Sequence, residues 1–318
     1  MASLVTGLLA VLVATNQPSA VNPLAREKTA AKMETAAPNN AVEQEYVRLV
    51  LADQSADEET DRWMLENDRL AAAGAGDSAA TLRLRMKQRF EPVEKSYREF
   101  LERHPKHVKG HLAFGSFLND LGREDEAAAH YLVARDLDPK NPAAWNNLAI
   151  YYGHNSPVTN AFLCYEKAIE LDPLEPNYHQ DFATTVYLFR RDATNHYRIS
   201  EQQVFDKSIS LYRRALTLSS NDFKVATDLA QTYYGINPPR VRDALQAWEE
   251  ALKLAGDDAE RQGVRLHLAR WHRTAGDVEA ARRELNQITD AAFAPMKANI
   301  LRSLEKMAST PPARAKAP

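Results

Sequence analysis

Three closely spaced histidines are the residues whose spacing most resembles a metal site. His107 and His111 are four residues apart, a separation that places two side chains on one face of a helix, and His104 lies just before them. However, His111 occupies the position that Trp145 occupies 34 residues later (145 − 111), so we expect its ring to face a helical core. We therefore predict no metal site, and nothing else in the sequence indicates a cofactor.

The remaining patterns that support catalysis are missing from the sequence. It has no G-x-x-x-x-G-K-[ST] phosphate loop, no G-x-S-x-G nucleophile elbow, no H-E-x-x-H zinc motif and no G-x-G-x-x-G dinucleotide fingerprint. Cys164, the single cysteine, is expected to be a small buried residue beside Tyr165. The sequence therefore predicts a protein without enzymatic activity.

Charge gives no indication of a nucleic-acid partner. Lysine and arginine total 40 against 43 aspartates and glutamates, for a net charge of -3, which provides no general attraction to polyanions. Arg261, Arg265, Arg270 and Arg273 are spaced as a basic strip, but interspersed arginines on a helix usually form a solvated face. We expect no nucleic-acid partner.

A repeat with an offset of 34 residues organises the middle of the chain. In one segment the recurring positions hold Trp145, Leu148, Ala149, Tyr152, Ala161, Tyr165, Ala168 and Pro173. In the preceding segment the same positions hold His111, Phe114, Gly115, Leu118, Ala127, Tyr131, Ala134 and Pro139. The large residues form one apolar stripe per helix, and the closing proline ends the second helix of each segment. Small residues at 115, 149, 183, 230 and 269 are expected to let the second helix approach closely.

This pattern resembles the tetratricopeptide repeat (TPR) family, whose helix-turn-helix unit reads W-x2-L-G-x2-Y, then A-x3-F, then P. The resemblance implies an all-α fold, a right-handed α-solenoid of about six TPR-like helix hairpins with helical caps. The expected units are 74–107, 108–141, 142–175, 176–222 with an insertion, 223–258 and 262–290, within a solenoid over 74–290. In the first of these units, Pro92 is expected to start the second helix.

Segments outside the repeats are expected to cap the solenoid or to connect it. Residues 42–73 are predicted to form N-terminal capping helices, one of them starting at a capping box over 55–58, and 291–308 a C-terminal capping helix. The apolar run 4–14 predicts a signal peptide over 1–20, followed by a disordered linker over 21–41, and 309–318 is predicted to be a disordered tail. These features predict export to the periplasm or cell envelope. A buried or membrane-touching N-terminal helix is the alternative, and the protein is cytoplasmic if the leader does not function.

In the TPR family the first helix of each hairpin lines a concave groove that binds an extended peptide or a partner helix. Projected onto this chain, that groove consists of Asn147, Ile150, Asp181, Thr184, Tyr187, Asp228, Gln231, Tyr234, Arg270 and Arg273. Asn147, Asp181 and Asp228 share one position in successive units, so they are expected to form a ladder of hydrogen-bond acceptors along the groove. The ladder either binds the backbone of a ligand or only joins neighbouring repeats.

An insertion of 13 residues lies within 190–203, between the paired helices of the fourth unit. Its basic and aromatic residues suit an acidic or aromatic partner, although a surface extension without function is equally consistent, because lengthening a loop costs only about 0.6 kcal/mol per doubling.

The sequence thus predicts a non-catalytic protein-protein interaction scaffold that binds a peptide or partner protein in its groove. One alternative is an accessory subunit of an envelope enzyme or secretion complex that docks through the 190–203 insertion, and another is an enzyme that uses groove carboxylates. A membrane contact is expected only through an uncleaved N-terminal segment, and the oligomeric state is open. We also expect Trp145→Ala to destabilise the protein by about 3 to 5 kcal/mol, since the indole is predicted to fill the core of the best unit.

Overall fold

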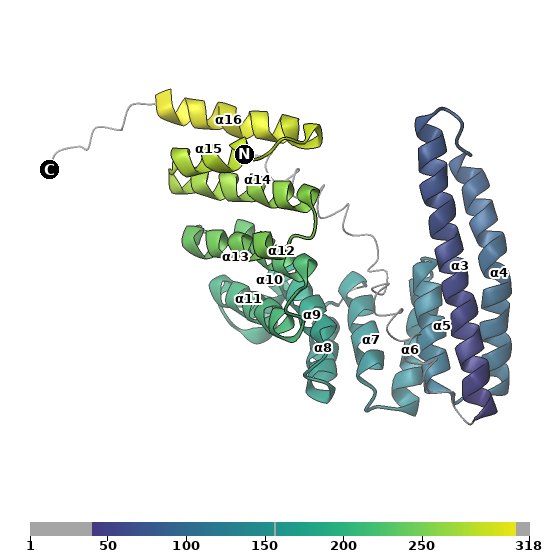
Figure 1. Ribbon diagram of the computed structural model, residues 1–318. Helices are drawn as coiled ribbons and strands as arrows, with labels where there is room; N and C mark the ends of the chain where they lie inside the picture. The colour runs from purple at the N-terminus through teal and green to yellow at the C-terminus, as the bar shows by residue number, and fades with distance from the viewer. Residues whose placement is uncertain (1–39, 156, 310–318) are drawn as a thin grey trace. The chain divides into compact units, whose positions relative to one another are not determined.

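The computed structural model describes residues 40–155 and 157–309, and the regular secondary structure of these residues is helical (Figure 1). The chain divides into two compact units with the boundary between Tyr151 and Tyr152, and each unit is described separately below. The predicted signal peptide and most of the predicted linker and tail lie outside the described residues. No helix of the described residues is long and apolar enough to cross a membrane.

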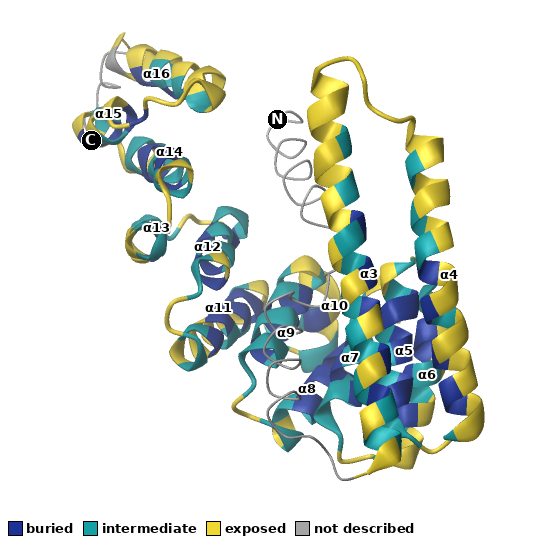
Figure 2. Ribbon diagram, turned by 45° about the vertical axis from the view of Figure 1, so that its right-hand side comes forward, coloured by how far each residue is buried: buried dark blue, intermediate teal, exposed yellow. Residues whose placement is uncertain are grey.

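Unit 1 begins with a hairpin of two long helices, α3 (Ala41–Ala72) and α4 (Ala79–Arg103). The buried residues of α3 recur every three or four positions: Tyr46, Leu49, Asp53, Ala56 and Thr60. This spacing keeps one stripe of the helix against its neighbour, and the Tyr97 hydroxyl of α4 donates to Asp53 Oδ2 at 2.7 Å within the seam. The end of α3 near Ala72 and the start of α4 near Ala79 are mostly exposed (Figure 2).

The structure differs from the sequence-based expectation for this hairpin. Residues 79–103 form one continuous helix with Pro92 inside it, where two short helices were expected, and Ser55 lies within α3 instead of starting a helix. An internal proline costs about 3 kcal/mol or more. Here Phe90, Val93 and Tyr97 continue one buried stripe across the proline, and the packing of that stripe offsets the cost.

The next hairpin joins α5 (Val108–Asp120) to α6 (Glu124–Leu137), and it confirms the prediction that a small residue is needed between paired helices. A Cβ atom at Gly115 would lie 2.7 Å from Cδ1 of Tyr131 and would overlap that ring. Ala183, Ala230 and Ala269, which hold the same position in later hairpins, have no exposed surface. The second helix therefore approaches as closely as the small side chains permit.

A repeated hydrogen bond joins the first helix of each of three successive units to the closing proline before it. His111 Nε2 lies 3.0 Å from the carbonyl oxygen of Pro105, and His179 Nε2 lies 3.1 Å from that of Pro173. Between them, Trp145 Nε1 donates to the carbonyl oxygen of Pro139 at 2.9 Å. Since a carbonyl only accepts, both histidines carry their proton on Nε2. Each ring thus binds the carbonyl oxygen of the proline that follows the preceding helix.

Trp145 lies on α7 (Pro142–His154), and its burial is less complete than the prediction for Trp145→Ala assumed. Trp145 is half-buried, while Leu148 and Ala149 of the same helix are fully buried. Because the ring makes one hydrogen bond at the junction and does not fill the core, we expect a cost nearer 1 to 2 kcal/mol than the cost of emptying a core position.

Unit 2 continues as a series of helices whose last member covers the end of the array. The helices are α8 (Thr159–Leu171), α9 (Pro176–Leu188), α10 (Arg190–Tyr197), α11 (Glu201–Leu218), α12 (Phe223–Thr232), η1 (Tyr233–Gly235), α13 (Val241–Leu254), α14 (Asp258–Ala275), α15 (Val278–Asn286), η2 (Ala291–Phe293) and α16 (Ala294–Ser309). α9 pairs with α11, α12 with α13, and α14 with α15. Ile300 and Leu304 of α16 are buried against Leu266 and Leu285, as expected for a terminal cap.

The insertion forms helix α10, which packs against the rest of unit 2. Ala193 is fully buried, and the Tyr197 hydroxyl donates to Glu166 Oε1 of α8 at 2.8 Å. Lys207 Nζ of α11 lies 4.3 Å from the centre of the Tyr197 ring, within the range of a cation–π contact. One side of the insertion is therefore part of the packed structure of this unit.

Candidate functional site

Eight of the predicted groove residues lie on the first helices of unit 2, and we call them the first-helix face. They are Asp181, Thr184 and Tyr187 on α9, Asp228 and Gln231 on α12, Tyr234 on η1, and Arg270 and Arg273 on α14. All eight are half-buried, so each keeps some accessible surface. Asn147 and Ile150, the other two predicted groove residues, lie on α7 in unit 1 and are also half-buried. The structure therefore groups eight of the ten predictions within one unit.

The α9–α12 part of the face is joined by a carboxylate. Asp228 Oδ2 accepts a hydrogen bond from Gln180 Nε2 of α9 at 3.2 Å and an ion-paired hydrogen bond from Lys224 Nζ at 2.9 Å. This oxygen thus connects two successive first helices. For Asp228, the structure favours the alternative in which the ladder joins neighbouring repeats.

Thr184 also takes part in contacts between helices. Its hydroxyl donates to the carbonyl oxygen of Gln180 at 3.1 Å, so the hydroxyl of Tyr212, 2.7 Å away on α11, donates to Thr184. Burial raises the pKa of Tyr212 well above its usual value, and the charges of Asp228 and Asp181 act in the same direction. The α9–α12 part of the face is thus acidic, and its polar groups are used in packing.

Tyr187 lies against a glycine of the next repeat. A Cβ atom at Gly235 would be 2.7 Å from the Tyr187 hydroxyl and 3.0 Å from its Cε2, so the side chain rests directly on the backbone of η1. Burial raises the pKa of Tyr187, which keeps the hydroxyl neutral at physiological pH. A glycine at this position is required for the two repeats to approach.

Aromatic rings support the α14 part of the face. The Tyr234 hydroxyl lies 2.9 Å from His267 Nδ1, and its ring stacks on Trp271 at 4.9 Å between centroids. His267 in turn stacks on Trp248 at 4.0 Å with an interplanar angle of 2°. Burial, together with the neighbouring charge of Arg270, lowers the pKa of His267 to about 3, so this imidazole is neutral. The rings of His267, Trp271 and Trp248 therefore hold the tyrosine in place.

Arg270 and Arg273 lie beside that hydroxyl. Burial raises the pKa of Tyr234 to about 12, while the two guanidinium groups act in the opposite direction. Arg273 Nη1 donates to Ser303 Oγ of α16 at 3.3 Å. The α14 part of the face is thus basic, in contrast to the part formed by α9 and α12.

The sequence did not indicate the supporting residues His267 and Trp271. His267 holds the position of Asn147, Asp181 and Asp228, immediately before the stripe residue Leu268, and this signal could have pointed to it. Trp271 holds no recurring position, and the roles of both residues depend on which rings of α13 and η1 meet α14 in three dimensions. The expected basic character at this end of the face rested only on the arginines.

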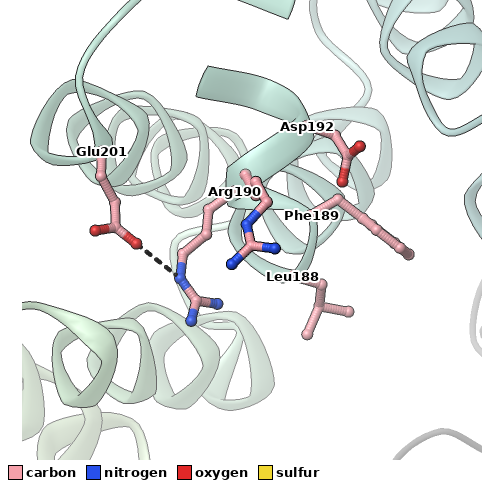
Figure 3. A pocket seen from close by; sticks show the side chains of 6 residues that line it. Leu188, Phe189, Arg190, Asp192 and Glu201 are labelled. Atoms are coloured by element: carbon pink, nitrogen blue, oxygen red, sulfur yellow. Dashed lines mark hydrogen bonds and ion pairs between the residues drawn. The ribbon is translucent and has the colours of Figure 1, made fainter. Parts of the chain in front are cut away.

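A shallow hollow of about 370 Å³, separate from the first-helix face, lies at the start of α10 (Figure 3). It is lined by Leu188, Phe189, Arg190, Arg191, Asp192 and Glu201. Arg190 Nε donates to Glu201 Oε1 at 3.1 Å across it, which closes part of the hollow by an exposed ion pair. Among the described residues, no group of three or more histidine, cysteine, aspartate or glutamate side chains is placed to hold a metal ion.

Comparison with known proteins identifies the repeat and the fold. Residues 94–142 match the family model described as tetratricopeptide repeat. YrrB, a TPR protein described as having an unusual peptide-binding site, is 14% identical, and the match covers 66% of this chain and 99% of that one at a TM-score of 0.51. PilW, a type IV pilus biogenesis factor, is 15% identical over 80% of this chain and 99% of its own, with a TM-score of 0.50. No curated protein matches the sequence.

A longer neighbour extends the same comparison. The Cut9–Hcn1 hetero-tetramer of the APC/C contains a chain that is 14% identical, and the match covers 90% of this chain and 54% of that one at a TM-score of 0.50. Identities this low concern the fold alone. The fold is that of an α-solenoid built from helix hairpins.

Proposed function

Since the chain is a tetratricopeptide repeat protein, we propose that it is a non-catalytic interaction scaffold that binds an extended segment of a partner protein on the first-helix face of unit 2. TPR proteins generally serve as interaction scaffolds, and YrrB, a neighbour in fold, is described as having an unusual peptide-binding site. The binding mode proposed for this chain is the recognition of an extended backbone and its side chains by a preformed surface.

One observation carries the proposal: two half-buried tyrosines are held in fixed positions on adjacent first helices. Tyr187 rests on Gly235, and Tyr234 is held by His267 and Trp271. Tyrosine offers a large apolar contact area and a polar end, and a ring that is already immobilised loses little entropy when a partner binds. The two rings therefore supply preorganised contacts for a peptide.

The carboxylates of the face support a scaffold better than an enzyme. Asp228 is occupied by Gln180 and Lys224, and it is not paired with a second acid or a base in the way that general acid-base catalysis requires. An enzyme that uses these carboxylates is accordingly not favoured. We likewise propose a protein or peptide partner instead of nucleic acid, because the face combines acidic and basic parts.

Docking through the insertion is the second candidate. Its inner side is used in packing through Ala193 and Tyr197, so a partner would have to bind Arg191 and Asp192 at the exposed start of α10. The hollow there is shallow and partly closed by the Arg190–Glu201 ion pair. The experiment below therefore includes a variant of the insertion, which distinguishes docking through α10 from binding on the first-helix face.

Export remains part of the proposal. The apolar run 4–14 supports a leader, and a scaffold in the cell envelope would meet its partner there. The N-terminal sequencing of protein recovered from a periplasmic fraction tests this, and a cytoplasmic protein with its N-terminus intact contradicts it.

The binding experiment is affinity purification with crosslinking, followed by direct binding of whatever partner is recovered. We expect Tyr187→Ala/Tyr234→Ala to weaken that binding by about 10-fold or more, since each ring contributes about 1 kcal/mol or more of contact. Leu163→Ala/Leu174→Ala is the matched control, because both leucines are exposed apolar residues of the same unit outside the face. Circular dichroism verifies that each variant is folded.

The arm for the insertion is Arg191→Glu/Asp192→Lys, which changes exposed residues and spares the buried side of α10. A partner lost with this variant and retained with the tyrosine variant would favour docking through the insertion. If the leucine control lost partner binding to the same extent as the other variants, both proposals would be contradicted.

A further inference from the structure

The outer half of the α3–α4 hairpin, residues 61–89, is called the arm below. It contains no buried residue, whereas the inner half of the same hairpin buries residues such as Tyr46 and Tyr97 (Figure 2). Helices of this length gain most of their stability by packing an apolar stripe against a neighbour. Four of the eleven large apolar residues that are exposed in the described chain lie in the arm: Met64, Leu65, Leu70 and Leu84. The arm therefore presents apolar surface that the rest of the described chain leaves uncovered.

Two contacts between its helices hold the arm together. Arg89 Nε donates to Glu59 Oε2 at 2.7 Å at the base of the arm. Further out, the guanidinium carbon of Arg85 lies 3.9 Å from the centre of the Trp63 ring, a cation–π contact. These contacts use one side of each helix and leave the opposite side to solvent.

Each helix of the arm carries an exposed stripe on the side turned away from these contacts. The two stripes consist of Asp61, Met64, Leu65 and Asp68 on α3 and of Ala80, Arg83, Leu84 and Lys87 on α4, and all eight residues are exposed. Both follow the spacing i, i+3, i+4, i+7, which places four side chains on one face of a helix. At 3.6 residues per turn, each stripe lies roughly half a turn round its helix from the residues that make the two contacts. The stripes thus face away from each other within one copy of the chain.

The two stripes have the same layout and opposite charges. On α3 the apolar centre is flanked by Asp61 and Asp68, and on α4 it is flanked by Arg83 and Lys87. The wider segment 57–68 holds six acidic residues and one basic residue, whereas 79–89 holds four basic residues and no acidic one. Among the described residues, none of the four flanking charges makes an ion pair, since the ion pair between these segments is that of Glu59 and Arg89. Each stripe is therefore complementary to the other, although the two cannot meet within one chain.

We propose that the arm is the surface through which two copies of this chain associate. The acidic stripe of α3 in one copy packs antiparallel against the basic stripe of α4 in its partner, with Leu65 against the partner's Leu84 at the centre. A twofold axis along the arms repeats this contact, so both stripes of both copies are covered and the assembly closes as a dimer. Pairing of α3 with α3 would place carboxylates together, and that repulsion fixes which helices pair.

The layout of the hairpin favours a second copy over a different protein. Another partner would have to offer a basic helix to α3 and an acidic helix to α4 at the spacing of this hairpin. A second copy carries both at that spacing. The inference does not depend on the proposed function, because the arm lies in unit 1 and the first-helix face in unit 2.

Sedimentation velocity of the full-length protein tests the inference. We expect the average mass to rise with protein concentration towards twice that of one chain. Asp61→Lys/Asp68→Lys makes both stripes basic, and Arg83→Glu/Lys87→Glu makes both acidic, so each variant should weaken self-association by about 10-fold or more. An equimolar mixture of the two variants should restore association, because each then offers the charges that the other lacks.

Glu249→Lys/Glu305→Lys is the matched control. It changes the net charge as much as Asp61→Lys/Asp68→Lys does, at exposed residues of α13 and α16, and it should leave association unchanged. Circular dichroism verifies that every variant is folded.

The inference is overturned if the parent protein remains a single chain at every concentration, or if the arm variants associate as tightly as the parent. It is also overturned if the mixture of the two charge variants stays monomeric, since acid-on-base pairing would then not be the contact. A control that weakens association as much as the arm variants do has the same meaning, because net charge would then act without the arm.

Discussion

The two parts of the first-helix face use their charges differently. On α9 and α12 the carboxylate of Asp228 is bonded to Gln180 and Lys224 and joins two repeats. On α14 the guanidinium groups of Arg270 and Arg273 lie beside Tyr234 without a carboxylate partner in the described residues. A charged residue at a recurring position of a repeat can therefore either stabilise the array or remain available to a ligand. The contacts decide which role it has.

The comparison also separates two kinds of support. The α9–α12 part is held by hydrogen bonds between helices, whereas the α14 part is held by stacked rings behind the charged groups. Substitutions in the first part should reduce stability, and substitutions of the arginines in the second should reduce binding. The following predictions test that distinction in order of decreasing effect.

Trp248→Ala should have the largest effect on stability. The indole is 1% exposed and stacks on His267, so its removal leaves a large cavity behind the basic part of the face. We expect a loss of about 3 to 5 kcal/mol in the free energy of unfolding of unit 2, measured by urea denaturation. Trp145→Ala, at a half-buried tryptophan, is the control and should cost only about 1 to 2 kcal/mol. Equal costs would show that ring stacking does not support this part of the face.

Lowering the pH should destabilise unit 2 through His267. Its pKa is about 3 when folded and rises to its ordinary value of about 6.5 on unfolding, so the unfolded state binds the proton more strongly between these values. The contribution of neutral His267 to the free energy of unfolding is therefore fully present above about pH 6.5. It decreases as the pH falls, with an expected loss of about 3 kcal/mol by pH 4. The pH dependence of urea unfolding measures this, and His267→Gln serves as the comparison. A variant with an unchanged pH dependence would contradict the assignment.

Asp228→Ala should cost about 1 to 2 kcal/mol in the free energy of unfolding of unit 2, because it removes the acceptor that Gln180 and Lys224 share. Lys224→Ala should cost less than about 1 kcal/mol, since the lysine is largely exposed and surface ion pairs contribute little. A neutral effect of Asp228→Ala would mean that this carboxylate is as available to a ligand as the arginines are.

Arg270→Gln/Arg273→Gln should have the smallest effect on stability, within about 0.5 kcal/mol of the parent protein in the same urea measurement. The reason is that the charges removed have no carboxylate partner among the described residues. A loss comparable to that of Asp228→Ala would show that the arginines serve packing and would remove the contrast between the two parts.

Much of the fold could be predicted because large, small and proline residues recur at fixed intervals in the sequence. The stripe around Phe114 and Phe182, the small residues that face the second helices, and the terminal cap all follow from periodicity and size. The first hairpin could not be predicted in this way. Pro92 has the signature of a helix start, yet the buried stripe that passes through it keeps α4 continuous.

The candidate site was predicted less completely. The sequence placed Tyr187, Tyr234 and the two arginines on first helices, but it could not show that Asp228 is occupied or that His267 stacks on Trp248. These facts depend on pairs of residues far apart in the chain, such as Gln180 and Asp228 or Tyr234 and His267. No short-range pattern encodes such pairs.

By itself, the sequence determined the helical hairpins and their order, because the spacing of large, small and proline residues sets which faces can be buried and where helices end. Only the tertiary structure decided which polar groups of the first helices are hydrogen-bonded or ion-paired within the protein. The free energy of a charged side chain depends on the partners and the solvent within a few ångströms of it, and residues remote in sequence supply those partners.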